Sequence, residues 1–200
     1  MTLFLVICQG IGLALAAGIR PYLPALVAGA AASADLFYAD FDGTDFGFLE
    51  GSWFLLAVVL VLIGVVVLER RIGEEELERG PYGAALAGIA LGIGGLLFAG
   101  SLAGEDYTPW PGLAAGIACA ALSQAAVRSL FRRTRTRLDA AARDALPLYA
   151  NGLALVLAAL SILAPPVGLV ALAFVTWLLL SGRRREGEKY AGLRILGRDE

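Results

Sequence analysis

The sequence predicts an all-α, polytopic helical membrane protein with about six to seven membrane segments. Of its 200 residues, 58% are hydrophobic, and the apolar residues gather into runs of the length needed to cross a bilayer, about 20 residues. The connecting segments alternate between acidic and basic, as expected for helices that cross back and forth. The apolar regions near both ends of the chain are interrupted by proline, which predicts broken helices there.

Three continuous apolar runs each predict one membrane helix. They cover residues 52–68, 81–104 and 111–131. The second run begins with Pro81, a residue well suited to the first turn of a helix because its missing N–H would have no intrahelical partner there. Each run joins an acidic loop to a basic segment. The three helices are therefore expected to run in, out and in again.

The two end regions are too long for one upright span. Residues 3–34 would extend roughly 48 Å as a single helix, against a hydrocarbon core of about 30 Å. A break at Arg20-Pro21 divides them into two short helices or into a span and a half-helix, and both alternatives remain open. Residues 145–181 are divided in the same way at Pro165-Pro166, which predicts a tight helical pair.

Charge placement predicts the orientation. Every lysine and arginine except Arg20 lies in one of three segments, at residues 70–79, 128–143 and 183–198. The positive-inside rule makes these segments cytoplasmic. The acidic loops at residues 35–51 and 105–111 then face outward, and the C-terminus is cytoplasmic.

The chain is expected to form one domain. Residues 1–185 predict a single transmembrane helical domain, and residues 186–200 a cytoplasmic tail. Residues 16–20 can be laid on residues 124–128, which suggests a weak inverted repeat of the kind that many transporters use. Alanine-rich helices align easily, so the absence of a repeat remains the alternative.

Arg20 is the main functional lead, because it is the only charged side chain in the first 34 residues. An arginine at membrane depth is costly and is normally paired or turned toward water. A charge combined with a helix break is typical of transporter sites. The alternative is that Arg20 caps a turn at the cytoplasmic surface and completes the positive-inside pattern.

The composition argues against an enzyme. Without histidine, the chain has neither a Ser-His or Cys-His nucleophile pair nor a histidine metal ligand. No Asp or Glu lies within a predicted span, which disfavours coupling to protons or sodium. No cofactor, metal site or nucleic acid is expected. The leading hypothesis is a small transporter or channel for a small anionic solute. The candidate pathway residues are polar residues and prolines at membrane depth: Gln9, Arg20, Pro21, Tyr22, Pro24, Gln124, Tyr149 and Asn151.

The alternative function is a structural or accessory membrane protein without a transported substrate. Besides the bilayer itself, the arginine clusters would suit anionic lipid at the inner leaflet. Transport predicts that Arg20, Tyr22 and Asn151 share a water-filled cavity near the middle of the membrane. An accessory role predicts a packed, dry core and a conspicuous exposed patch. For any one polar residue in a span, hydrogen bonding between helices is the commoner role.

Small residues four apart predict close helix packing. They let helices approach within the bundle or within a homo-oligomer, and the pattern does not choose between these. The glycine pairs are Gly88 with Gly92, Gly100 with Gly104, and Gly112 with Gly116.

The segment Gly18-Ile19-Arg20-Pro21-Tyr22-Leu23-Pro24, followed by small apolar residues, also carries a family resemblance. Gly18, Tyr22, Leu23 and Pro24 resemble the N-terminal signature of the bacterial membrane family called domain of unknown function 4126. Arg20 stands where that pattern more often has asparagine, so a role specific to its charge is not implied for the family. The order of the later spans is similar as well. The resemblance implies a multi-pass protein of the bacterial inner membrane and implies no activity.

Overall fold

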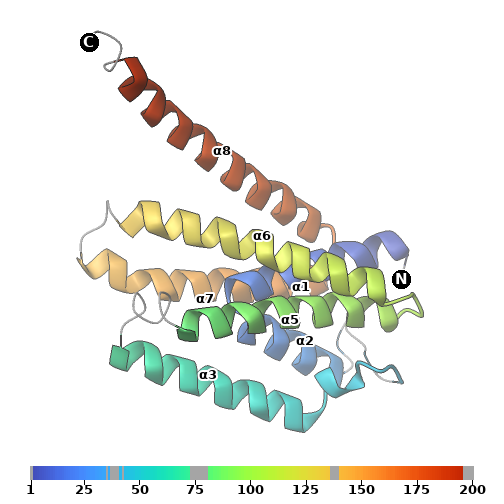
Figure 1. Cartoon of the computed structure of the whole chain (residues 1–200). Coiled ribbons are helices and arrows are strands. Elements are labelled where there is room, and N and C mark those ends of the chain that lie inside the picture. The colour runs from blue at the N-terminus through green and yellow to red at the C-terminus, as the bar shows by residue number, and fades with distance from the viewer. Residues whose placement is uncertain are drawn as a thin grey trace.

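The computed structural model describes residues 2–34, 36, 41, 43–72, 81–135 and 140–195. Among these residues, helices are the only regular secondary structure. The longer elements are α-helices, and a short 3-10 helix precedes α3 (Figure 1). The elements are α1 (Leu3–Ile19), α2 (Tyr22–Ser33), η1 (Gly47–Leu49), α3 (Ser52–Ile72), α5 (Pro81–Ala103), α6 (Trp110–Arg135), α7 (Ala140–Leu163) and α8 (Val167–Ile195). The predicted all-α fold is confirmed for the described part of the chain.

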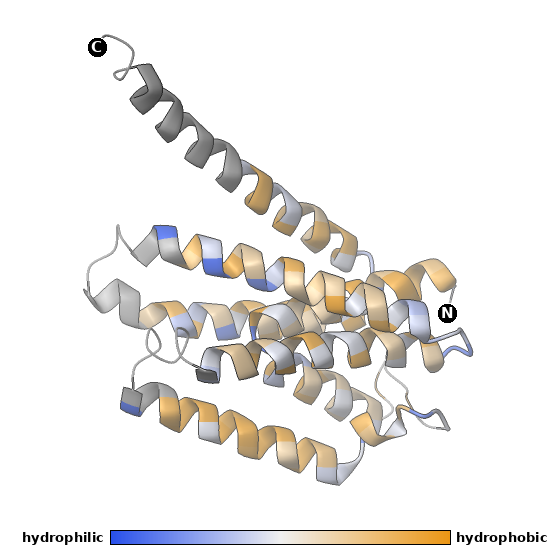
Figure 2. Ribbon diagram, viewed as in Figure 1, coloured by the Kyte–Doolittle hydropathy of each residue, from blue (hydrophilic) through white to orange (hydrophobic). Residues whose placement is uncertain are grey.

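Three helices contain segments long and apolar enough to cross a membrane: Tyr82–Ala103, Trp110–Phe131 and Ala145–Leu163. Four further apolar helices are shorter: Leu3–Ile19, Tyr22–Ser33, Ser52–Leu68 and Val167–Ser181. Apolar residues follow one another along most of α3 (Figure 2), and several of them are exposed. Trp53 and Leu60 on α3, for example, are 86% and 60% exposed. Apolar spans with an apolar exterior are what a lipid environment requires.

The chain breaks at both proline sites. α1 ends at Ile19, and Arg20 is extended at φ −148° and ψ 108°. A residue before proline is pushed toward this region by contact with the proline ring. Pro21 then takes a helical conformation and α2 begins at Tyr22. Residues 3–34 therefore form two short helices, roughly 26 Å and 18 Å long at 1.5 Å per residue. Pro165 and Pro166 separate α7 from α8.

α1 is the central helix of the bundle. It packs against α5, α6, α7 and α8, and Figure 1 shows it surrounded by the others. Nearly every residue from Val6 to Gly18 is buried, as expected for a helix that is apolar on all sides. Its many glycines and alanines keep it thin enough to have so many neighbours.

The two ends of the bundle differ in charge. We call one the acidic end, because the connections before α3 and between α5 and α6 lie there together with the N-terminus (Figure 1). The other is the basic end, where α3 and α6 end and α5 and α7 begin. α1 therefore runs from the acidic end to the basic end and α2 returns. Most of the basic segment predicted at residues 70–79 lies outside the described residues, because the description stops at residue 72 and resumes at residue 81. Helix α8 continues to Ile195, so most of the predicted tail is helical, and residues 196–200 lie outside the described part.

The proposed inverted repeat is not supported by this arrangement. α1 is antiparallel to α5, since Gly10 lies against Phe98 while Gly94 lies against the Ala14 carbonyl. α6 is also antiparallel to α5, because a short turn joins them. α1 and α6 consequently run in the same direction, whereas the alignment of residues 16–20 with 124–128 as an inverted repeat requires opposite directions.

The predicted glycine contacts divide into two groups. A Cβ on Gly112 would lie 3.1 Å from the Phe98 carbonyl oxygen, and one on Gly116 would lie 2.8 Å from the Gly95 Cα, so both glycines permit close packing of α6 on α5. Gly100 leaves similar room for the ring of Phe41. Gly104 follows α5, where its amide donates to the Gly100 carbonyl at 2.9 Å.

Gly88 and Gly92 are different. A Cβ at either position would meet nothing within 4 Å among the described residues. Their predicted packing role within the bundle is therefore wrong, because the face of α5 that carries them points away from the other helices. Contact with a second copy of the chain stays a prediction for these two glycines.

Candidate functional site

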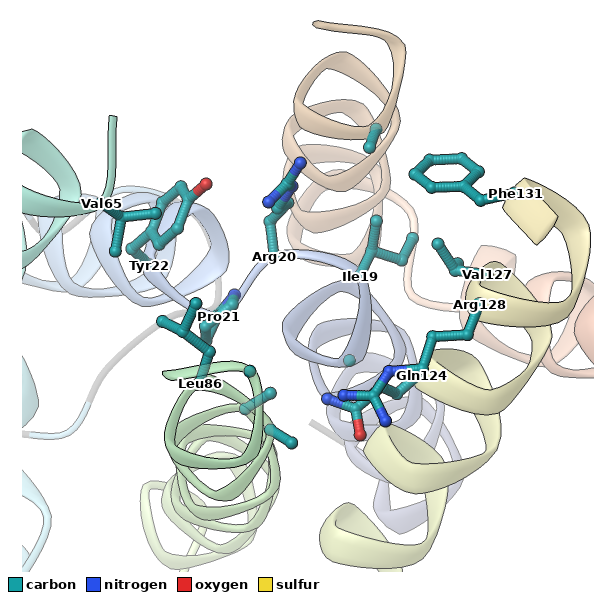
Figure 3. A pocket seen from close by; sticks show the side chains of 15 residues that line it. Ile19, Arg20, Pro21, Tyr22, Val65, Leu86, Gln124, Val127, Arg128 and Phe131 are labelled. Atoms are coloured by element: carbon teal, nitrogen blue, oxygen red, sulfur yellow. The ribbon is translucent and has the colours of Figure 1, made fainter. Parts of the chain in front are cut away.

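A pocket lies where α1 breaks, at the basic end of the bundle (Figure 3). Its volume is about 80 Å³. A water molecule needs only about 10–15 Å³ of such space, so the pocket has room for several waters or a small ion. The lining comes from every α-helix except α8 and includes Ile19, Arg20, Pro21, Tyr22, Val65, Gly83, Leu86, Gln124, Val127, Arg128 and Phe131.

The helix register determines the depth of Arg20. Gly10 faces Phe98 and Ala14 faces Gly94, so each step along α1 matches an equal step back along α5. Continuing this register places Arg20 level with Gly88. The apolar span of α5 begins at Tyr82, so Arg20 lies about 9 Å inside that span at 1.5 Å per residue. This level is between the end and the middle of that span, and a cavity at mid-membrane stays a prediction.

Two arginines from different helices line this pocket. Arg20 follows the end of α1, and Arg128 lies on α6, one turn after Gln124. Figure 3 shows the polar groups of Gln124 and Arg128 side by side, with the guanidinium of Arg20 on the other side of the α1 terminus. Among the described residues that line the pocket, none is acidic. The pocket is therefore electropositive and suited to an anion.

A simpler role for the arginines is to stabilise the end of α1. A helix C-terminus has unpaired carbonyl groups and carries the equivalent of about −0.5 charge. Pro21 has no N–H, so it cannot bond to the Ala17 carbonyl as the next helical residue would. Two full positive charges nevertheless exceed about half a negative charge. The α2 N-terminus, whose half charge is positive, also lies here. Counted over the described residues that line it, the pocket thus has a positive balance of charge.

Tyr22 connects the pocket to α7. Its side chain is 3% exposed, and its hydroxyl donates to the Asn151 Oδ1 at 3.5 Å, the long limit for such a bond. Arg20 and Tyr22 therefore share the cavity as predicted from the transport hypothesis. Asn151 contacts Tyr22, and its neighbour Ala150 forms part of the wall.

The remaining predicted residues lie elsewhere. Gln9 is buried on α1, level with Ala99 and far from the Arg20 break. Tyr149 is 73% exposed on the outside of α7. Pro24 is buried in the first turn of α2, where a missing N–H is tolerated. Of the candidates, Arg20, Pro21, Tyr22 and Gln124 line the pocket.

Arg128 was missed as a site residue because it was assigned to the positive-inside pattern. A signal for it was present in the sequence, since Arg128 lies before the end of an apolar run at Phe131 and four residues after Gln124. Positions four apart share one face of a helix. Leu86 and Val65 could not have been found, because apolar residues in a span carry no such signal.

The bundle is tightly packed between this pocket and the acidic end. Residues 13–17 of α1 are each 0% exposed. A Cβ added to Gly18 would lie only 2.9 Å from the Ser123 Cβ. α1 therefore packs closely on α6 immediately next to the pocket. Tight packing therefore separates the site from the acidic end. Among the described residues, no group of three His, Cys, Asp or Glu side chains could hold a metal ion.

The fold and the site together define a helical bundle with membrane-compatible spans, a central broken helix and an electropositive pocket at the break. The chain belongs to the family described as Domain of unknown function (DUF4126), whose sequence model matches residues 7–185. The resemblance in residues 18–24 is thereby confirmed. No curated protein and no solved structure matches the chain.

Proposed function

We propose that the chain is a multi-pass protein of the bacterial inner membrane that binds an anion in the pocket at Arg20, as the inward-facing site of a small transporter. The observation that carries this proposal is that Arg20 and Arg128, from separate helices, line one pocket without an acidic residue among its described lining. Arg20 lies within the apolar part of the bundle, where a positive charge is costly and is commonly retained for a function. We propose no catalytic activity.

The orientation follows from the charges. The basic end is cytoplasmic under the positive-inside rule, which also places the C-terminus inside and the N-terminus outside. The pocket is then open toward the cytoplasm, and the packed residues 13–17 separate it from the outside.

This arrangement favours a transporter over an open channel. Release to the outside would require α1 and its neighbours to separate beyond Gly18. The break supplies a joint for such a movement, because α2 packs on α3 and α7 while α1 is held by four other helices. Rigid-body movement of one part of a bundle against another is how many transporters alternate between their two open states.

Flux in proteoliposomes tests the proposal. Purified protein is reconstituted, and the uptake of radiolabelled phosphate, sulfate and small carboxylates is measured for the wild type and for Arg20→Gln and Arg128→Gln. Uptake of at least one anion should fall about tenfold or more in both variants, because a hydrogen bond to a charged group is worth about 1.5–3 kcal/mol.

Arg71→Gln is the matched control. Arg71 is an exposed arginine near the end of α3 and is absent from the pocket lining, so its variant should transport at the wild-type rate. Anion flux that is indifferent to Arg20→Gln, or equal losses in all three variants, would contradict the proposal.

The second candidate is an accessory protein that binds a partner or anionic lipid and moves nothing. The tight packing of α1 and the exposed apolar face of α3 favour it. Its test is the same assay, in which anion binding without flux would support it. Binding of anionic lipid at the basic segments and assembly into a homo-oligomer stay predictions.

A further inference from the structure

An apolar groove lies directly beside the arginine pocket. Its volume is about 200 Å³, and it lies between α3 and α5 with α2 behind it. Ala57 and Val61 of α3 form one wall, and Ile89 and Ile93 of α5 form the other. An apolar cavity of about 150 Å³ is enough to bind benzene. The groove can therefore hold a hydrocarbon segment of more than six carbons.

The groove and the pocket are adjacent and share a wall. Pro21, Tyr22 and Leu86 line both of them. From this shared wall the groove extends along α5 from Leu86 to Ile93, about 10 Å at 1.5 Å per residue. This direction leads away from the basic end and toward the middle of the spans. The arginine pocket and the apolar groove thus follow each other in the same order and direction as the headgroup and acyl chain of a lipid in the inner leaflet.

The groove is open at its side. Val61 and Ile89, which face each other across it, are each 43% exposed. α3 packs mainly on α2 and η1 and leaves α5 uncovered along this line. A molecule in the bilayer could therefore enter laterally, without passing through water.

We infer that pocket and groove form a single site for an anionic phospholipid, with its phosphate in the pocket that Arg20 and Arg128 line and one acyl chain between α3 and α5. The inference rests on the proposed anion site and names the class of its ligand. A guanidinium has five N–H donors, so a bond to a protein group leaves others for phosphate, and arginine binds phosphate in a bidentate manner. The long arginine side chains allow their charges to reach toward the headgroup level.

Lipid retention on the purified protein tests the site. Phosphatidylglycerol and zwitterionic phosphatidylcholine with identical chains are added in detergent, and bound lipid is counted by native mass spectrometry. Phosphatidylglycerol should be preferred about tenfold or more, as expected from a charged hydrogen-bonded contact. Arg128→Gln should remove this preference, and Arg20→Gln provides a second variant at the same pocket.

Ala57→Trp tests the groove separately. Ala57 is an exposed residue, so a larger side chain there fills the groove without entering the core. Phosphatidylglycerol retention should fall about tenfold, in keeping with the energies of apolar burial. Leu60→Trp is the matched control, because Leu60 is also exposed on α3 and is not part of the groove wall. It should retain lipid like the wild type.

A second measurement, thermal unfolding in the presence of inorganic phosphate, tests the anion site without a lipid. It therefore distinguishes failure of the lipid inference from failure of the anion site. Equal binding of the two lipids, or phosphatidylglycerol retention that is unaffected by Ala57→Trp, overturns the lipid inference. If phosphate still stabilises the wild type and not Arg20→Gln, the anion site survives that result. If neither phosphate nor phosphatidylglycerol binds selectively, both proposals fail.

Discussion

Gly12 on α1 lies against Gly168 on α8, where a Cβ added to Gly12 would be 3.2 Å from the Gly168 Cα and 2.7 Å from the Ser161 Cβ. This contact ties the central helix to the pair of helices that ends the chain. It forms where the proline break after α7 brings α8 back toward α1. The absence of side chains at both positions is what permits the approach.

Gly12→Ala should therefore destabilise the protein. Overpacking of a close contact costs about 1–3 kcal/mol, so we expect a lower midpoint of thermal unfolding in detergent. Gly92→Ala is the control, because its new Cβ would meet nothing within 4 Å. The control should be neutral or more stable by up to about 1 kcal/mol, from the higher helix propensity of alanine. Equal midpoints for the two variants would refute the packing assigned to Gly12.

Labelling of Arg20→Cys should occur from the cytoplasmic face alone. Cys8 and Cys119 are first replaced by alanine, and an impermeant thiol reagent is then applied to either face of the membrane. The pocket opens toward the basic end, while residues 13–17 are fully buried. Leu13→Cys is the negative control and should react from neither side. Labelling of position 20 from outside would reverse the topology or require an open pore.

Ser123→Ala should stabilise the protein. The Ser123 side chain is 0% exposed, and its hydroxyl has no hydrogen-bond partner among the described residues. A buried unsatisfied group costs about 1–3 kcal/mol, which alanine removes. Ser161 is equally buried, but its hydroxyl donates to the Leu157 carbonyl at 2.6 Å. Ser161→Ala should accordingly lower the free energy of unfolding, by about 1 kcal/mol. Thermal midpoints that move in the same direction for both variants would be inconsistent with this difference.

Phe41→Ala should be strongly destabilising although Phe41 precedes the first turn of η1 in a connecting segment. Its ring is 1% exposed and packs in one cluster with Leu49 and Leu97, against Gly100. Removal of a buried phenylalanine ring costs about 3–5 kcal/mol. Phe48 is the matched control, because it is 48% exposed and has an edge-on contact with Phe54 at 5.6 Å.

Phe48→Ala should cost no more than about 1.5 kcal/mol, the upper range for one aromatic pair. Unfolding in detergent, followed by circular dichroism, measures both variants. If Phe41→Ala lowers the stability no more than Phe48→Ala does, the packing of Phe41 in the core would be contradicted.

Much of the helix layout was predictable because it depends on local properties. Apolar runs mark the spans, and proline acts on its own backbone and that of the preceding residue. Arg20-Pro21 and Pro165-Pro166 could thus be recognised as breaks before any packing was known. The family signature in residues 18–24 was equally local, and the matching family model confirmed it.

The candidate site was only half predictable. Arg20 and Tyr22 stood out because a charge and two prolines interrupt an apolar run. Arg128 resembled every other basic residue at a span end, and its role depends on α6 lying beside the end of α1. One of the glycine pairs failed as a predictor of bundle packing for a related reason. Gly88 and Gly92 have the same spacing as Gly112 and Gly116, but spacing does not reveal which face of a helix meets a neighbour.

By itself, then, the sequence determined the helical class, the breaks and the charge difference between the two ends, since each depends on hydropathy or backbone chemistry within a few residues. Only the tertiary structure decided that α1 is the buried centre, that Arg20 and Arg128 line one pocket, and that an apolar groove lies beside it. These relationships join residues far apart in the chain. They arise from the mutual packing of several helices, which no single segment encodes.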